Sequence, residues 1–227
     1  MKLSRFDYKK VLLLILTIAA VCVLKLHYIN SLPYDSFADL VCNSLVFWGD
    51  NQFVNLIWCL PILINLLYIS KKYYEQLVVF NMRYKNRNFF ILHTIKNCFV
   101  YSVFCNLIIV LVHIIFILYT TQNNILFSLD LVKFIVTYVL MNSFLNYIAV
   151  YFALISRHYI YSLLTTIIVC IFSFILFYNN EYLLFPRLFY SNEIILALII
   201  LLFGIVCLIR RKYLKLDIGG LENDFRN

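Results

Sequence analysis

Residues 97–119 read NCFVYSVFCNLIIVLVHIIFILY and contain no Asp, Glu, Lys or Arg. The stretch falls within the roughly 17 to 25 residues that an α-helix needs to cross a bilayer. A helix is the expected structure, because lipid offers the backbone no hydrogen-bond partner. We therefore expect a transmembrane helix here, and the flanking sequence decides how many others accompany it.

Five further apolar stretches flank this one, at residues 11–28, 53–70, 131–155, 160–178 and 194–208. The first follows a basic segment, as a signal peptide does, but it continues to near spanning length and lacks an A-x-A cleavage pattern. We expect it to be a retained helix. The predicted fold class is an all-α integral membrane protein with six transmembrane helices, forming a single domain over residues 1–227.

Lysine and arginine are concentrated on one side of these stretches. One side, made up of the N-terminal segment and every second loop, holds Lys2, Arg5, Lys9, Lys10, Lys71, Lys72, Arg83, Lys85, Arg87, Lys96, Arg157, Arg210, Arg211, Lys212, Lys215 and Arg226. The other side holds Lys25, Lys133 and Arg187. The positive-inside rule therefore predicts that both termini lie in the cytoplasm. We interpret the net charge of +8 as a signal of topology and of contact with anionic lipid, and we expect no nucleic-acid partner.

The composition argues against several enzyme classes. Hydrophobic residues make up 64% of the chain and charged residues 13%, which leaves no room for a separate soluble catalytic domain. The sequence contains no GxxxxGK[ST] loop, so we expect no ATP site in this chain, and it contains no HExxH or GxSxG motif. The seven cysteines form no CxxC pair and are interpreted as small buried hydrophobes. We expect no catalytic residue, metal or cofactor.

A few polar residues lie inside the spans, whose central parts carry no charge. This absence of charge disfavours ion-coupled transport. Asn142 and Asn146 are four residues apart and share one helical face. Together with Asn106 and His113 they form a candidate substrate path. The alternative interpretation is that these side chains hydrogen-bond neighbouring helices and serve only packing.

Two segments between the spans are amphipathic. The inner segment, residues 71–96, reads KKYYEQLVVFNMRYKNRNFFILHTIK and joins the second and third spans. We expect it to lie along the inner membrane surface as helix and turn. On the other side, residues 37–48 predict a short interfacial helix that places Phe47 and Trp48 at headgroup level.

This layout resembles that of small bacterial ABC-2-type transporter permeases. The shared features are six spans with cytoplasmic ends, a basic N-terminal segment, a long basic inner loop and an aromatic-rich outer segment before the last span. Residues 80–90, FNMRYKNRNFF, are similar to a basic stretch of permeases encoded beside an ATPase in bacteriocin and peptide-export operons. The resemblance covers nearly the whole chain in layout and about a dozen residues in motif.

The resemblance implies a function and a set of partners. It implies export of a hydrophobic or amphipathic substrate, such as a bacteriocin, for secretion or self-immunity, by a multi-pass protein of the bacterial plasma membrane. ATP and Mg²⁺ would bind a separate P-loop ATPase subunit, and a second permease copy or a sister permease would complete the pathway. The contact with the ATPase would involve some of Glu75, Gln76, Arg83, Lys85, Arg87, Asn88, Phe89 and Phe90.

Two other classes stay open. His93 and Cys98, at the start of the third span, offer the base and nucleophile of a membrane cysteine peptidase that processes a peptide precursor. Their spacing of five places them less well on one helical face than a spacing of three or four. A membrane immunity protein that transports nothing would instead act by binding, without an ATPase.

Overall fold

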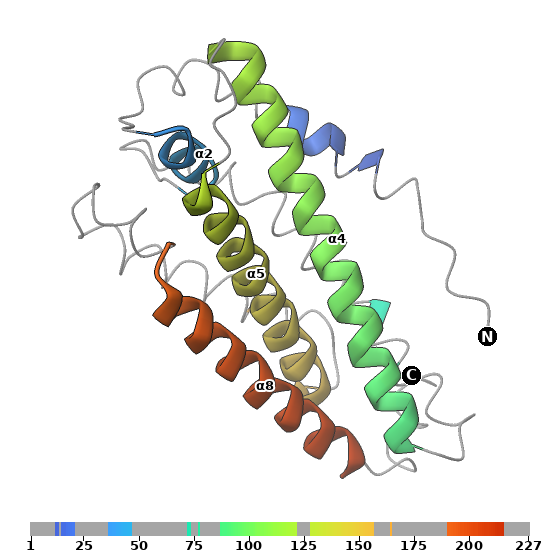
Figure 1. Ribbon diagram of the computed structural model, residues 1–227. Coiled ribbons are helices and arrows are strands. Elements are labelled where there is room, and N and C mark those ends of the chain that lie inside the picture. Colours follow the sequence, from blue (N-terminus) through green and yellow to red (C-terminus); the bar gives the residue numbers. More distant parts are fainter. Residues whose placement is uncertain are drawn as a thin grey trace.

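The computed structural model describes residues 12–13, 15–20, 36–46, 72–73, 77, 87–121, 128–156, 164 and 190–215. All regular structure in this part of the chain is helical (Figure 1), with α2 at Phe37–Val46, α4 at Arg87–Thr121, α5 at Leu129–Ser156 and α8 at Asn192–Leu214. By length and composition, α4, α5 and α8 are long and apolar enough to cross a membrane. The described part is therefore an all-helical protein of the membrane type.

Three predicted spans, 97–119, 131–155 and 194–208, lie within α4, α5 and α8. The α4 helix begins at Arg87, whereas the predicted span begins at residue 97, so residues 87–96, expected to lie along the membrane surface as helix and turn, are helical and continuous with the span. Charged residues lower the hydropathy of this segment, but Arg and Lys are good helix formers. Residues 53–70 lie outside the described part, and 11–28 and 160–178 are described only at a few helical positions. Six spans and cytoplasmic termini stay predictions.

Serines precede three of the helices. Ser36 Oγ accepts a hydrogen bond from the Asp39 backbone N–H (3.1 Å) and donates one to Asp39 Oδ2 (2.7 Å). Ser128 Oγ accepts from the Leu131 N–H at 3.2 Å, and the Ser191 carbonyl accepts the first bond of α8 from Ile195 at 3.4 Å. The two side-chain contacts, of Ser36 and Ser128, satisfy donors that a helix start leaves unpaired, whereas Ser191 makes no side-chain cap.

The α5 helix lies in the middle of the bundle, between α4 and α8, with α2 beside its first turns (Figure 1). Side chains on several faces of α5 are buried, and Phe134 and Tyr138 are almost inaccessible. A helix that is apolar on all faces is expected at the centre of a bundle. The sequence of α5 therefore suits its central position.

The α8 helix buries a single stripe. Leu202, Ile205, Ile209 and Tyr213 are its buried residues, and their spacing places them on one side of the helix. The other faces are apolar but exposed, and the Phe203 side chain is 71% accessible. Apolar exposure of this extent is unusual for a protein surrounded by water. Lipid tails are as apolar as leucine, so an apolar side chain loses nothing by facing them. The exposed faces of α8 therefore fit a lipid environment.

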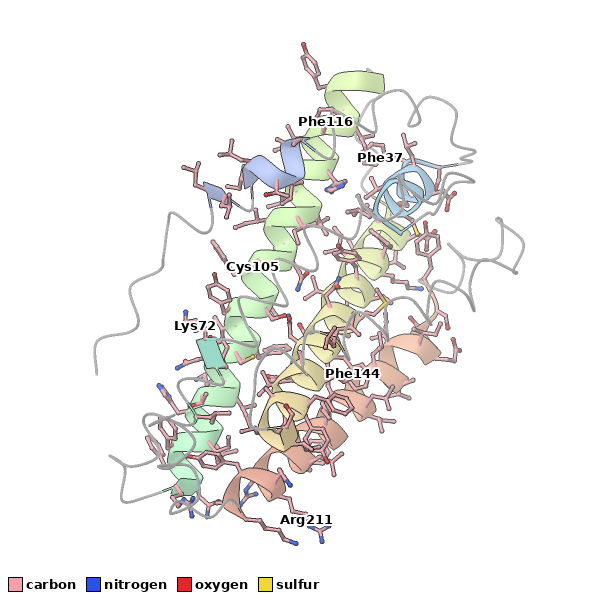
Figure 2. The ribbon with its side chains drawn as sticks, turned by 180° about the vertical axis from the view of Figure 1, so that it is seen from behind. Phe37, Lys72, Cys105, Phe116, Phe144 and Arg211 are labelled. Carbon is pink, nitrogen blue, oxygen red and sulfur yellow. The ribbon has the colours of Figure 1, made fainter. Side chains whose placement is uncertain are left out.

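The described charges separate along the bundle. Figure 2 shows Arg211 at one end, and Phe37 and Phe116 toward the other. The basic residues Arg87, Lys96, Arg210, Lys212 and Lys215 lie in the first turns of α4 or at the end of α8, as Arg211 does. The acidic residues Asp39, Asp130 and Glu193 lie in the first turns of α2, α5 and α8. Because α5 and α8 start at the opposite end from α4, these six basic residues share one end of the bundle, whereas Lys133 lies near the start of α5 at the acidic end.

The predicted helix at residues 37–48 is present as α2. It packs against α4 and α5 and buries residues on more than one face, namely Phe37, Ala38, Leu40, Val41, Cys42 and Leu45. The helix therefore belongs to the packed end of the bundle. Phe47 and Trp48, predicted at headgroup level, lie outside the described residues.

Candidate functional site

Five polar side chains meet between α4 and α5, and we call them the amide cluster: Ser102, Asn106, Asn142, Ser143 and Asn146. None of them is more than 1% accessible. Two come from α4 and three from α5, and on each helix the spacings of three and four place the members on one face. The antiparallel packing of the two helices brings these faces together.

Ser102 is the centre of the hydrogen bonding in the amide cluster. The hydroxyl groups of Ser102 and Ser143 share a hydrogen bond of 3.0 Å across the two helices. Asn146 Nδ2 donates to Ser102 Oγ at 2.6 Å, also across the helices. Asn106 Nδ2 donates to the Ser102 carbonyl (2.8 Å) and to its hydroxyl (3.3 Å). A single hydroxyl group therefore joins both helices.

Three oxygen atoms of the amide cluster are buried without a hydrogen-bond partner among the described residues. They are the Oδ1 atoms of Asn106, Asn142 and Asn146. Asn142 Nδ2 donates to the Tyr138 carbonyl at 3.0 Å, so only the oxygen end of that amide is unsatisfied. Leaving a buried acceptor unpaired costs about 1–3 kcal/mol. Three such atoms in one place are a feature that helix packing alone does not require.

His113 lies apart from this cluster. It is buried on α4, seven residues beyond Asn106, which is about two helical turns. Its Nδ1 donates to the Ile109 carbonyl at 2.9 Å. The structure thus brings together three of the four residues of the predicted substrate path, Asn106, Asn142 and Asn146, and places His113 further along α4.

Sequence reasoning missed the part played by serine in this site. Ser102 is four residues before Asn106, the same spacing as between Asn142 and Asn146. This repeated spacing was a usable signal, because residues four apart share a helical face. Which serine meets which asparagine depends on the register between α4 and α5, and a single sequence carries no measure of that register.

The first turn of α4 is braced by the last turns of α8, and we call this the α4–α8 end contact. Arg210 Nη2 donates to Asn88 Oδ1 at 3.4 Å. The Phe90 and Tyr213 rings pack with centroids 6.4 Å apart, and the Arg87 guanidinium carbon lies 5.8 Å from the Tyr213 ring centroid. Arginine over an aromatic ring is a favourable arrangement.

The first turn of α4 holds half of the residues predicted to meet an ATPase, and three of them, Arg87, Asn88 and Phe90, take part in this contact. Phe89 is 66% accessible and stacks on His93 with ring centroids 6.3 Å apart, and Asn88 is exposed as well. Both are therefore reachable by a partner, while Phe90 is buried against α8. Glu75, Gln76, Arg83 and Lys85, the other predicted contact residues, lie outside the described part.

The start of the inner segment packs close to the amide cluster. Lys72 Nζ lies 4.5 Å from the Tyr101 ring centroid and 5.7 Å from that of Tyr73. Tyr73 and Leu77 are buried. Tyr101 directly precedes Ser102, so the inner segment contacts α4 at the level of the amide cluster.

The pair proposed for a cysteine peptidase does not meet in this geometry. Five residues along a helix turn a side chain through about 140° from the first, because one turn takes 3.6 residues. Cys98 is 2% accessible, whereas His93 is only partly buried and stacks on Phe89. Within the described residues, no group of three or more His, Cys, Asp and Glu side chains is arranged to hold a metal.

At the other end of the bundle, Tyr190 joins α2 to the start of α8. Its hydroxyl donates to Asp39 Oδ1 at 2.8 Å, while Asp39 Oδ2 accepts from Ser36. Burial, followed by the proximity of Cys42 and the bond to Asp39, raises the pKa of the Tyr190 hydroxyl. The group therefore stays protonated and keeps donating to the carboxylate.

We expect Tyr190→Phe to destabilise the protein by about 1.5–3 kcal/mol, because the variant removes the charge-assisted hydrogen bond to Asp39 Oδ1 and leaves only that from Ser36 to Oδ2. The loss should appear as a lower midpoint of thermal unfolding of the purified protein in detergent. Tyr119→Phe is the matched control, since Tyr119 is 84% accessible. Equal midpoints for the two variants would show that the Tyr190 bond contributes nothing.

Comparison of the chain with models of protein families, with curated proteins and with solved structures finds no match. The class of the protein therefore follows from its own sequence and structure. It is a helical protein in which three of the described helices are long and apolar enough to cross a membrane.

Proposed function

We propose that this chain is the membrane-spanning permease subunit of an ATP-driven ABC exporter of the bacterial plasma membrane, and that it moves a hydrophobic or amphipathic substrate such as a peptide bacteriocin. It hydrolyses no ATP itself; ATP and Mg²⁺ bind a separate P-loop ATPase. A second copy of the chain, or a sister permease, completes the pathway. The observation that carries the proposal is the α4–α8 end contact, where residues expected to meet the ATPase lie on the rigid end of a long helix.

That helix offers a direct route from the ATPase to the substrate. Arg87 and Asn106 lie on the same uninterrupted helix, 19 residues apart, which corresponds to about 28 Å. A displacement of the first turn therefore moves the amide cluster as well. The packing of Phe90 on Tyr213 makes α8 follow the same displacement, so the end contact transmits motion to two helices at once.

The amide cluster then lines the path in the open state. Ser102 forms two hydrogen bonds to α5, with Ser143 and Asn146. Hydrogen bonds between transmembrane helices average only about 0.6 kcal/mol, so a movement of α4 driven by ATP binding is sufficient to break them. Separation of the two helices exposes the asparagine side chains to a substrate.

The test of the proposal is a mild-detergent pull-down of the tagged chain from its native host, followed by mass spectrometry and an ATPase assay. We expect a P-loop ATPase in stoichiometric amount and ATP hydrolysis in the eluate. Recovery of the chain alone, without ATPase activity, would contradict the exporter and favour a peptidase or an immunity protein that needs no ATPase.

A further inference from the structure

The amide cluster holds more hydrogen-bond acceptors than donors. Each asparagine brings two N–H donors and an oxygen with two lone pairs, and each serine brings one donor and two lone pairs. The donors are directed at Ser102 and at the Tyr138 carbonyl. The three Oδ1 atoms are left over, each buried and without a partner among the described residues.

The orientation of two of these amides follows from their neighbours. The Ser102 and Tyr138 carbonyls can only accept hydrogen bonds, so the nitrogen atoms of Asn106 and Asn142 must face them. A reversed amide would place oxygen against oxygen. The unsatisfied atoms of Asn106 and Asn142 are therefore oxygens, and they call for a hydrogen-bond donor.

The surroundings of the cluster limit what that donor is. Residues 97–119 hold no charged side chain, and residues 131–155 hold only Lys133, which is nine residues before Asn142. Lys72 Nζ lies 4.5 Å from the Tyr101 ring centroid, at the level of the cluster, so a cation entering there loses its hydration and meets a like charge. Phosphate and carboxylate groups bring only acceptors when ionised. The remaining candidates are neutral molecules that carry several N–H or O–H donors.

We propose that the Oδ1 atoms of Asn106, Asn142 and Asn146 bind backbone N–H groups of a hydrophobic peptide. This rests on the proposed export function and names its substrate class. Side chains near the cluster suit the apolar part of such a peptide, because Cys105, Ile109 and Val139 on the same two helices are buried and apolar. A peptide crossing the membrane carries N–H groups that lipid cannot satisfy, and the three oxygens satisfy them.

Binding of a matched pair of probes tests this proposal. The full chain is placed in lipid nanodiscs without any ATPase, because hydrogen bonds between transmembrane helices average only about 0.6 kcal/mol and thermal motion opens the cluster to a probe. The probes are radiolabelled acetyl-leucyl-leucyl-leucine methyl ester and its analogue in which every backbone amide is replaced by an ester. The two share their apolar side chains, but only the first has N–H donors. We expect the peptide to bind at least about tenfold more tightly than the ester.

Two variants assign that preference to the cluster. In the double variant Asn106→Leu with Asn142→Leu, we expect the preference for the peptide over the ester to fall to about onefold to threefold. Asn97→Leu, at a half-buried asparagine of α4 outside the cluster, should keep it. Circular dichroism and gel filtration check that each variant is folded. If the double variant does not fold, the single replacements Asn106→Leu and Asn142→Leu are measured in its place.

Other results would overturn the proposal. Equal binding of peptide and ester to the unaltered chain would show that N–H groups are not recognised. A preference that survives in the double variant would place recognition elsewhere. A rise in thermal stability in sodium chloride over N-methylglucamine chloride, lost in the double variant and accompanied by no peptide preference, would assign the oxygens to a cation.

Failure of the exporter and failure of the peptide site are distinguishable. A preference for the peptide that depends on Asn106 and Asn142, in a chain that recovers no ATPase, supports the site and contradicts the exporter. A stoichiometric ATPase together with equal binding of peptide and ester supports the exporter and contradicts the site.

Discussion

We expect export to stop when Arg83 and Arg87 are both replaced by alanine, while the protein still inserts and folds. Arg87 lies at the end of α4 over the Tyr213 ring, and Arg83 belongs to the same basic stretch. An arginine at the centre of a protein interface contributes on the order of 2 kcal/mol to binding. Loss of two such residues weakens the contact with the ATPase by about a thousandfold. The measurement is export of the substrate, together with recovery of the ATPase in the pull-down.

The control must remove the same charge from the same end of the bundle. Arg211→Ala with Lys215→Ala does so, because both residues are exposed at the end of α8. We expect this pair to keep export and the ATPase. Equal loss in both double variants would mean that basic charge, and not a specific contact, is required. Normal export by the Arg83 and Arg87 variant would contradict the proposed position of the ATPase contact.

The second large effect is expected at the amide cluster. Asn106→Leu with Asn142→Leu should abolish export, because both unsatisfied oxygens that are proposed to face the substrate are removed. The same change removes two buried acceptors, each of which costs about 1–3 kcal/mol when unpaired. The midpoint of thermal unfolding should therefore stay the same or rise. Loss of function without loss of stability is the expected signature.

This combination separates the two interpretations of the polar residues. If Asn106 and Asn142 serve only the packing and hydrogen bonding of their helices, their replacement lowers stability, and export falls in proportion to the amount of folded protein. Export normalised to that amount, with Asn97→Leu as the control, distinguishes the two cases. Full export by a stable double variant would place the substrate path elsewhere.

The sequence allowed the helices to be predicted better than their ends. Residues 131–155 match α5 closely and residues 194–208 lie within α8, which continues to Leu214, because long apolar stretches leave no alternative in lipid. The start of α4 was missed because Lys96 and Arg87 lower the hydropathy of a segment that is nevertheless helical. Hydropathy marks where a helix is apolar, and it says little about where the hydrogen bonding of the helix begins.

The candidate site was predictable only one helix at a time. The common face of Asn142 and Asn146 follows from their spacing. Their meeting with Ser102 and Asn106 does not, because it depends on the antiparallel packing and register of α4 and α5. The same limit explains why His113, which is buried on α4, was grouped with residues from which it lies about two turns away.

The single buried stripe of α8 has a consequence for how this chain evolves. At Leu202, Ile205, Ile209 and Tyr213, shape is constrained by close neighbours. At positions such as Phe203 and Gly204, a substitution meets only what surrounds the bundle, and a Cβ atom added at Gly204 finds nothing within 4 Å. Selection at these positions requires an apolar side chain but no particular residue type. Descendants of this gene should therefore drift in sequence along most of α8 while retaining a conserved line of residues at every third or fourth position.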